Sequence, residues 1–139
     1  MKPYLWALLA AFCWGFVPII EKLGLAKMPV WAGVFYRCLG VSLGLVFLTV
    51  LNYSEIKKAV LEVPSGWYYV MIGGFLASVV GQILFYNALK TGEASKVVPV
   101  GAAYPLISFF LGIIIFKESF TLAKLAGLFF IVLGVILLK

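Results

Sequence analysis

Five long apolar runs dominate this sequence and constrain its fold more than any other feature. They are 17 to 23 residues long and cover Tyr4–Ile20, Val30–Leu51, Trp67–Leu89, Val97–Phe116 and Leu122–Leu138. About 20 apolar residues in a helix cross the roughly 30 Å hydrocarbon core of a bilayer. We therefore expect an all-α integral membrane protein with spans at about 4–25, 30–51, 67–89, 95–116 and 121–138.

The composition supports this reading. Of the 139 residues, 65% are hydrophobic and only 12% are charged, whereas soluble domains average about 25% charged residues. The net charge of +6 is not a nucleic-acid signal, because the lysines lie in or beside short connections, where they can meet lipid headgroups. No connection is long enough to hold a soluble domain. We expect one domain over residues 1–139, crossing the inner or plasma membrane several times.

Nothing in the sequence suggests an enzyme, a cofactor or a metal centre. The chain has no histidine, and it shows no nucleophile–base pair, phosphate-binding loop or cofactor motif. Cys13 and Cys38 lie inside apolar runs and are interpreted as small packing residues. Any function should therefore depend on binding and conformational change.

Two charges lie within or close to the apolar runs. Arg37 lies roughly 10 Å into the second run, and Glu21 lies about 6 Å before the end of the first helix at about 1.5 Å per residue. Because the first helix ends on the side where the second begins, the two depths are similar. Arg37 can pair with Glu21, extend to the near headgroups, or receive an anionic substrate. The residues leave these three alternatives open.

The third apolar run carries a polar stripe. Ser78, Gln82 and Tyr86 are four residues apart and share one helix face. A carboxamide that faces lipid would lack hydrogen-bond partners, so the stripe should point into the protein. It is either a set of interhelical hydrogen bonds or the wall of a substrate cavity.

Three prolines interrupt otherwise helical patterns. Pro18, Pro99 and Pro105 each lack an N–H group and displace the carbonyl four residues earlier. A simple kink with a local water would explain any one of them. Broken helices commonly mark binding sites in transporters, so we expect helix breaks at these positions. The neighbouring polar and aromatic residues are candidate substrate contacts, and they are Trp14, Tyr104 and Ser108.

Two stretches together resemble a known family. "LLAAFCWGFVPIIEKLGL" (residues 8–25) resembles the first-helix signature of EamA-type domains in the drug/metabolite transporter superfamily. "FYNALKTGEASKVVPVGAAYPLISFFLGIIIFKESFTLAKLAGLFFIVLGVILL" (residues 85–138) resembles the segment from the third helix to the fifth. Arg37 also matches an arginine often seen in the second helix of such domains. The resemblance covers nearly the whole chain.

This resemblance implies a carrier of small metabolites, often an exporter of amino acids or related compounds, that works by alternating access. Typical members join two five-helix domains in inverted orientation, so a single domain implies an obligate dimer. The substrate-binding residues would then be Trp14, Ser78, Gln82, Tyr86, Tyr104 and Ser108. The alternatives are a small multidrug-type cation exporter, a non-transporting membrane assembly subunit, or half of a heterodimer with a similar partner chain.

The lysines do not favour either orientation. With five spans the termini lie on opposite sides, and each side then carries five lysines. One side has Lys2, Lys57, Lys58, Lys117 and Lys124, and the other has Lys22, Lys27, Lys90, Lys96 and Lys139. Orientation normally follows an excess of Lys and Arg on the cytoplasmic side. We therefore expect dual topology and an antiparallel homodimer; the alternative is one fixed orientation set by insertion of the first helix, or a parallel dimer.

Overall fold

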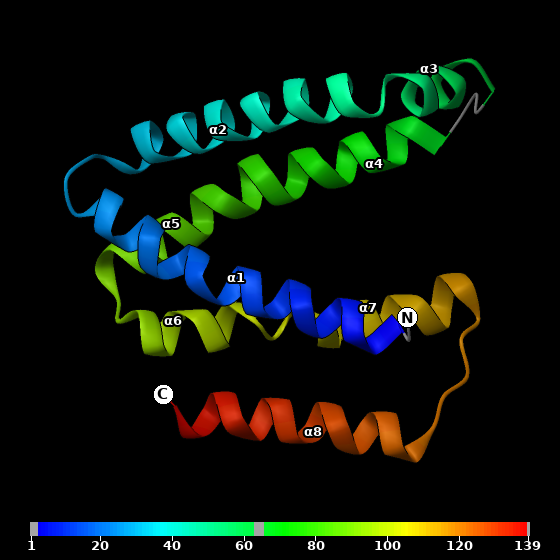
Figure 1. Cartoon of the computed structure of the whole chain (residues 1–139). Helices are drawn as coiled ribbons and strands as arrows, with labels where there is room; N and C mark the ends of the chain where they lie inside the picture. The colour runs from blue at the N-terminus through cyan, green and yellow to red at the C-terminus, as the bar shows by residue number, and fades with distance from the viewer. Residues whose placement is uncertain (1–2, 63–65, 139) are drawn as a thin grey trace. The chain divides into compact units, whose positions relative to one another are not determined.

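The computed structural model describes residues 3–62 and 66–138, and every regular element in them is helical. Figure 1 shows the helices in chain order. They are α1 (Pro3–Leu25), α2 (Val30–Leu51), α3 (Tyr53–Glu62), α4 (Gly66–Phe75), the π-helical segment η1 (Leu76–Val80), α5 (Gly81–Thr91), α6 (Ala94–Gly101), α7 (Tyr104–Phe116) and α8 (Leu122–Leu137). The predicted all-α fold class is confirmed for this part of the chain.

Four stretches are long and apolar enough to cross a membrane. They are Pro3–Leu25, Val30–Leu51, Gly66–Thr91 and Ala94–Phe116. The third combines α4, η1 and α5, and the fourth combines α6 and α7. The expected fifth span corresponds to α8, a shorter apolar helix of 16 residues. At about 1.5 Å per residue α8 is roughly 24 Å long, less than the typical hydrocarbon thickness.

The ends of α7 and α8 follow ordinary capping chemistry. Lys117 adopts a left-handed conformation with φ 53°, and its N–H donates to the Gly112 carbonyl. Glu118 N–H donates to the same carbonyl at 3.3 Å, so α7 closes in a Schellman-like turn. Thr121 begins α8 as its N-cap, because its hydroxyl accepts a bond from the Lys124 N–H at 3.3 Å.

The prolines differ in their effect on the helices. α1 runs through Pro18 and α6 runs through Pro99 without interruption, so the breaks expected there are not seen. A proline removes one intrahelical bond, and the helix can continue beyond it. Only Pro105 adjoins a break, since Ala102 and Ala103 separate α6 from α7 and Pro105 lies in the first turn of α7.

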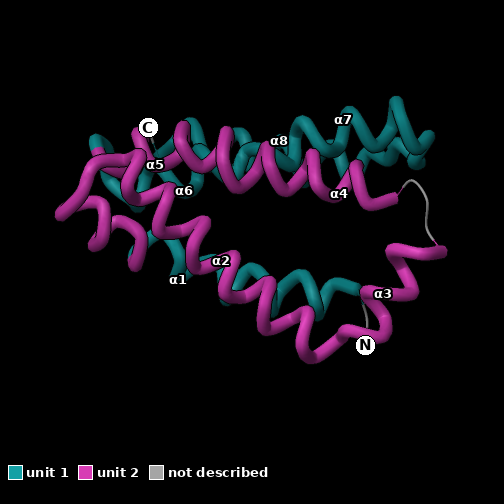
Figure 2. Tube along the Cα trace, turned by 90° about the horizontal axis from the view of Figure 1, so that it is seen from above, with its two compact units in different colours: residues 1–19, 91–139 teal, residues 20–90 magenta. Residues whose placement is uncertain are grey.

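The chain divides into two compact units. Unit 1 comprises residues 1–19 and 91–139, and unit 2 comprises residues 20–90, as coloured in Figure 2. In unit 1, α6 packs near α8. Unit 2 holds the end of α1, all of α2 through η1, and α5 up to Lys90.

A small apolar core fixes one end of unit 2. Leu25, Val30, Val34, Tyr86 and Leu89 are buried there, where the end of α1, the start of α2 and α5 meet. Gly33 permits this approach, because a Cβ atom at that position would lie 2.7 Å from Leu25 Cδ2 and 3.2 Å from Tyr86 Cε2. Small residues allow close helix packing in membranes in this way.

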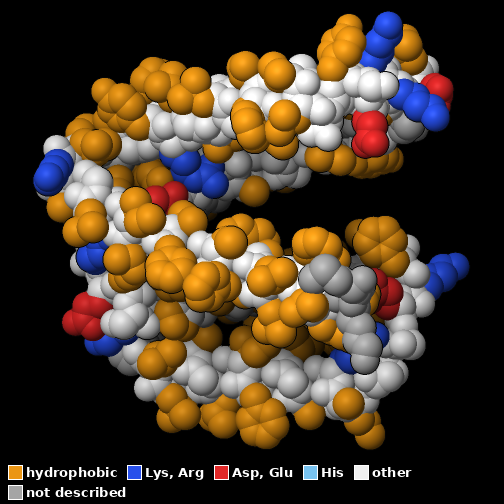
Figure 3. Space-filling model, viewed as in Figure 1, with side chains coloured by type: hydrophobic (Ala, Val, Ile, Leu, Met, Phe, Trp, Pro, Cys, Tyr) orange, Lys and Arg blue, Asp and Glu red, His pale blue; other side chains and the backbone are white. Residues whose placement is uncertain are grey.

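Most other apolar side chains are exposed to the surroundings. In Figure 3 they extend along the helices, and most charged side chains lie near the helix ends. Because lipid tails are as apolar as leucine, such a surface is stable in a bilayer and not in water. The chain is a multi-pass membrane protein.

One helix lies where the sequence analysis placed only a connection. α3 (Tyr53–Glu62) follows α2 after the single residue Asn52. The Asn52 N–H and side-chain amide both donate to the Leu48 carbonyl, at 2.9 and 3.2 Å, which closes α2. The Ile56 N–H donates to the Asn52 carbonyl at 3.0 Å. Asn52 therefore ends one helix and begins the next.

The core of unit 2 predicts a position-dependent effect of added methyl groups. Gly33→Ala should lower the stability of the protein by about 1–3 kcal/mol, because the new methyl overlaps Leu25 and the Tyr86 ring. Gly40→Ala is the matched control on the same helix, since its added Cβ meets nothing within 4 Å. Thermal unfolding of both variants in detergent micelles measures the difference, and equal midpoints would contradict the packing described.

Candidate functional site

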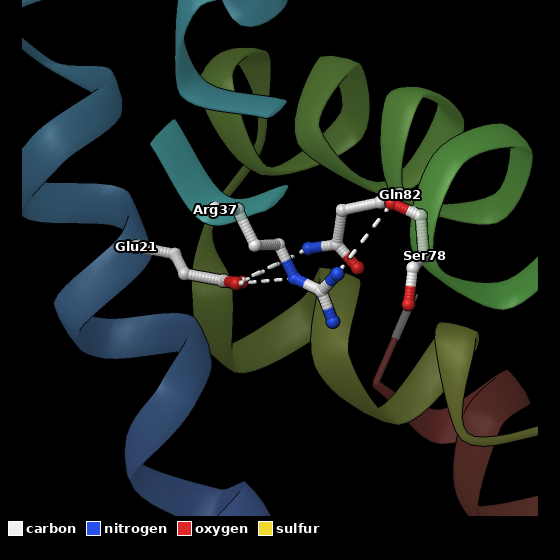
Figure 4. A network of polar contacts seen from close by, with 4 residues as sticks. All are labelled: Glu21, Arg37, Ser78 and Gln82. Atoms are coloured by element: carbon white, nitrogen blue, oxygen red, sulfur yellow. Dashed lines mark hydrogen bonds and ion pairs between the residues drawn. The ribbon is translucent and has the colours of Figure 1, made fainter. Parts of the chain in front are cut away.

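A polar cluster joins three membrane-spanning segments of unit 2. Its members are Glu21 of α1, Arg37 of α2, Ser78 of η1 and Gln82 of α5. Figure 4 shows the side chains of Glu21, Arg37 and Gln82 pointing toward one another, while Ser78 meets Arg37 through its backbone. None of the four is fully buried, but each is less exposed than most side chains around it. They form the most polar internal region described in this unit.

Glu21 and Arg37 form an ion pair. Arg37 Nε lies 3.4 Å from Glu21 Oε1, and the two side chains are 28% and 12% exposed. Of the three alternatives that the sequence left open for Arg37, the structure places it against Glu21. An unpaired arginine at this depth would be costly in lipid, and the carboxylate removes much of that cost.

Gln82 holds the carboxylate from a third helix. Its Nε2 donates to Oε1 and Oε2 of Glu21 at 3.3 and 3.2 Å. The carboxylate of Glu21 in α1 thus forms an ion pair with α2 and accepts hydrogen bonds from α5. Interhelical hydrogen bonds of this kind contribute about 0.6 kcal/mol on average in membranes.

Arg37 also contacts the backbone of the third span. Its Nη1 donates to the Ser78 carbonyl at 3.4 Å. Ser78 belongs to the π-helical turn Leu76–Val80, and such turns shift the carbonyl positions and often occur at functional sites. Ser78 therefore joins the cluster through its backbone carbonyl oxygen. Its place in the predicted polar stripe depended on its side chain instead.

Tyr86 lies one turn beyond Gln82 but packs into the apolar core. Its side chain is 3% exposed, and its ring lies beside Gly33. The polar stripe Ser78–Gln82–Tyr86 thus faces the interior of unit 2 along its whole length. Ser78 contributes its carbonyl and Gln82 its amide to the polar cluster, and Tyr86 places its ring in the apolar core while its hydroxyl is hydrogen-bonded to Glu21.

The other candidate residues belong to unit 1. Trp14 and Tyr104 are exposed, at 65% and 59%. Tyr104 and Ser108 line an open groove of about 550 Å³ between α7 and α8. That Trp14, Gln82, Tyr86 and Tyr104 bind one substrate stays a prediction, because Trp14 and Tyr104 lie in unit 1 and Gln82 and Tyr86 lie in unit 2.

Two residues of this groove were missed in the sequence analysis. Glu118 and Lys124 line the same groove as Tyr104 and Ser108. A Cβ atom at Gly112 would lie 3.4 Å from the Glu118 carboxyl carbon, so the side chain folds back over α7. The left-handed Lys117 causes this reversal, and a lysine gives little sequence signal for such a turn. Within residues 3–62 and 66–138, no group of three metal-binding side chains occurs.

The cluster predicts coupling between its two charges. Glu21→Arg and Arg37→Glu should each destabilise the protein, because each leaves like charges together. The double variant should recover roughly 0.5–3 kcal/mol relative to the sum of the singles. Recovery should be partial, since a carboxylate at position 37 would face the Ser78 carbonyl.

Thermal unfolding of the four proteins in micelles gives the coupling energy. Lys58→Glu with Glu62→Lys is the matched control, because that pair is 4.0 Å apart and exposed. Exposed pairs contribute about 0–1 kcal/mol. A double variant no more stable than the worse single variant would contradict the ion pair.

Comparison with known proteins identifies the family. The model of the EamA-like transporter family matches residues 1–139. An uncharacterized protein of Methanocaldococcus jannaschii is 33% identical over 132 residues, which cover 95% of this chain and 92% of that protein. An uncharacterized transporter of Archaeoglobus fulgidus is 28% identical over 133 residues, which cover 96% of this chain and 45% of that protein.

A shorter relative is known as well. An uncharacterized transporter of Sinorhizobium is 26% identical over 134 residues, which cover 96% of this chain and 93% of that protein. No solved structure gives a significant match. The family match extends over the whole chain and agrees with its apolar spanning helices. The chain belongs to the EamA-like transporter family.

Proposed function

We propose that this protein carries small polar metabolites across its membrane by alternating access, acting as a dimer. Family membership and the transporter names of its relatives support the general activity. Amino acids or related compounds are the proposed substrates, as the family resemblance implies. Transport in this proposal depends on binding and helix movement.

The single observation that carries the proposal is the charge-balanced cluster inside the spans. Glu21, Arg37 and Gln82 connect three spanning segments through a few long hydrogen bonds and one ion pair. Contacts of 3.2 to 3.4 Å are near the weak end of hydrogen bonding. Such bonds can exchange for bonds to a polar substrate without leaving a charge unpaired in lipid.

The same geometry disfavours a multidrug-type cation exporter. Such a carrier needs an acidic side chain that a cation and a proton can occupy in turn. Here the Glu21 carboxylate already faces the Arg37 guanidinium and the Gln82 amide. Another alternative is a non-transporting assembly subunit, in which the polar residues of the cluster would serve stability alone.

Length supports the dimer. The chain spans less than half of the Archaeoglobus transporter but nearly the whole of the Methanocaldococcus and Sinorhizobium proteins. Two copies of this chain supply the length of the longer relative. In the proposed dimer the copies lie antiparallel, which reproduces the inverted repeats common in transporters, with a shared site near the midplane. A similar partner chain could replace the second copy.

Transport by purified protein tests the proposal. In liposomes that contain only this protein, we expect uptake of at least one compound from a panel of labelled amino acids chosen by thermal shift. Gln82→Ala should reduce the rate roughly 3- to 20-fold, the range expected for one interhelical hydrogen bond of about 0.6–1.7 kcal/mol. Tyr104→Ala should also reduce it, through the groove that Tyr104 lines.

Two matched variants control for general damage. Asn87→Ala removes an amide from the same helix as Gln82, where Asn87 donates to the Ile83 carbonyl. Tyr36→Ala removes a tyrosine that is 59% exposed, like Tyr104. Normal transport by Gln82→Ala and Tyr104→Ala would place the substrate elsewhere, and no transport by the natural chain would support an assembly subunit or a heterodimer.

Topology provides a separate prediction. Reporter fusions after Lys139 should show the C-terminus on both sides of the membrane in comparable amounts, because the lysines of the two sides are balanced. Three lysines added between Asn52 and Gly66 should shift the fusions to one location. A single location for the natural chain would contradict the antiparallel homodimer but not transport itself.

A further inference from the structure

The connecting helix α3 has a feature that the transport proposal does not use. All ten of its residues are exposed, and none is buried against the rest of the chain. It is nevertheless amphipathic, because Tyr53, Ile56 and Val60 are three and four residues apart and share one face. Val60 is 72% exposed there. A ten-residue helix with so little packing is marginal in water.

The position of α3 limits what can cover this face. α2 has 22 residues and is about 33 Å long, so a crossing helix ends at the membrane surface. Only Asn52 separates its last residue from α3. In Figures 1 and 2, α3 turns away across the direction of α2. A helix tied in this way to the end of a span lies along the interface.

The charges of α3 are sorted by face. Lys58 and Glu62 lie opposite the apolar face and pair at 4.0 Å, whereas Ser54 and the exposed Leu61 lie on the flank between the two faces. Glu55 lies on that opposite side as well. Lys57 is different, because it follows Tyr53 by four residues and precedes Val60 by three. It borders the apolar face, and no ion pair of Lys57 is seen among the described residues.

We propose that α3 is a membrane-surface helix that inserts Tyr53, Ile56 and Val60 at the boundary of headgroups and acyl chains, with Lys57 bound to a lipid phosphate. A lysine that flanks an apolar face can bury its aliphatic stem while its ammonium reaches the phosphate layer. Both acids face water, so nothing repels an anionic headgroup from the inserted side. The bilayer surface therefore fits the apolar face of α3, the lysine that borders this face, and the position of α3 at the end of a span.

Fluorescence quenching in vesicles tests this arrangement in the full chain. Cys13 and Cys38 are replaced by alanine, and an environment-sensitive dye is attached to Val60→Cys or to Ser54→Cys. With iodide on both sides of the membrane, the dye at position 60 should be quenched several-fold less by iodide than the dye at position 54. Nitroxide-labelled lipid should show the opposite order. The control is Ser54, because it lies on the same helix but outside the face formed by Tyr53, Ile56 and Val60.

Three other results would overturn the proposal. Equal iodide quenching at both positions would mean that α3 stays in water, and equal lipid quenching would mean that it lacks an interfacial orientation. Protection of position 60 from both quenchers would mean that protein covers the face, either a second copy or another chain. None of these readouts depends on transport activity.

A charge test separates Lys57 from its neighbour. In vesicles of phosphatidylcholine with phosphatidylglycerol, Lys57→Glu should increase iodide quenching at position 60 several-fold, because it brings a carboxylate to the phosphate layer. Lys58→Glu makes the same charge change on the face toward water and should have little effect. Equal effects of the two variants would show that Lys57 does not bind lipid phosphate.

Discussion

A charge inside a bilayer must have a partner or reach water, and that requirement organises unit 2. Arg37 is the only charge in α2, and its guanidinium is held by a carboxylate from α1 and a carbonyl from η1. The apolar core beside this cluster positions the three segments, but it is small and lies at one end of the unit. The polar contacts therefore determine how the spans meet farther along their length.

Two lysines extend this principle to the end of the unit. Lys22 Nζ donates to the Leu89 carbonyl at 2.9 Å, and Lys90 Nζ donates to the Met28 carbonyl at 2.7 Å. Lys22 of α1 thus bonds to α5, and Lys90 of α5 bonds to the connection between α1 and α2. The Leu89 carbonyl lies near the C-terminus of α5, where the helix dipole places partial negative charge that attracts a cation, and the Met28 carbonyl belongs to the connection between α1 and α2. Both lysines thus stabilise the packing of the helices in addition to meeting lipid headgroups.

Apolar length predicted most of the fold. The four long spans follow from runs that have no other stable conformation in lipid. α3 was missed because its apolar residues are interspersed with charged ones, so it falls outside the long apolar runs, and none of its ten residues is buried against the rest of the chain. The π-helical turn at Leu76–Val80 was also missed, since no residue type demands it. The breaks expected at Pro18 and Pro99 are absent because a helix tolerates the loss of one hydrogen bond.

The candidate site was predictable in part. The positions of Glu21 and Arg37 along their helices predicted similar depths in the membrane. They did not show whether Arg37 pairs with Glu21, reaches the headgroups or binds a substrate. Helical spacing placed Gln82 on an inward face, yet its partner was not apparent from the sequence, because Glu21 is 61 residues away. The carbonyl contact of Ser78 depends on backbone geometry, which side-chain chemistry does not reveal. Contacts between residues that are far apart in the sequence become apparent only in the folded structure.

The sequence separation of these contacts bears on how the chain enters the membrane during synthesis. Glu21 and Arg37 are 16 positions apart, and four residues join α1 to α2. Gln82 is synthesised after both of these helices. The first helical hairpin can therefore neutralise its own charges while it moves from the insertion channel into lipid. The later helix then adds a neutral amide to a pair already formed, so no stage of biogenesis requires a lone charge to enter hydrocarbon.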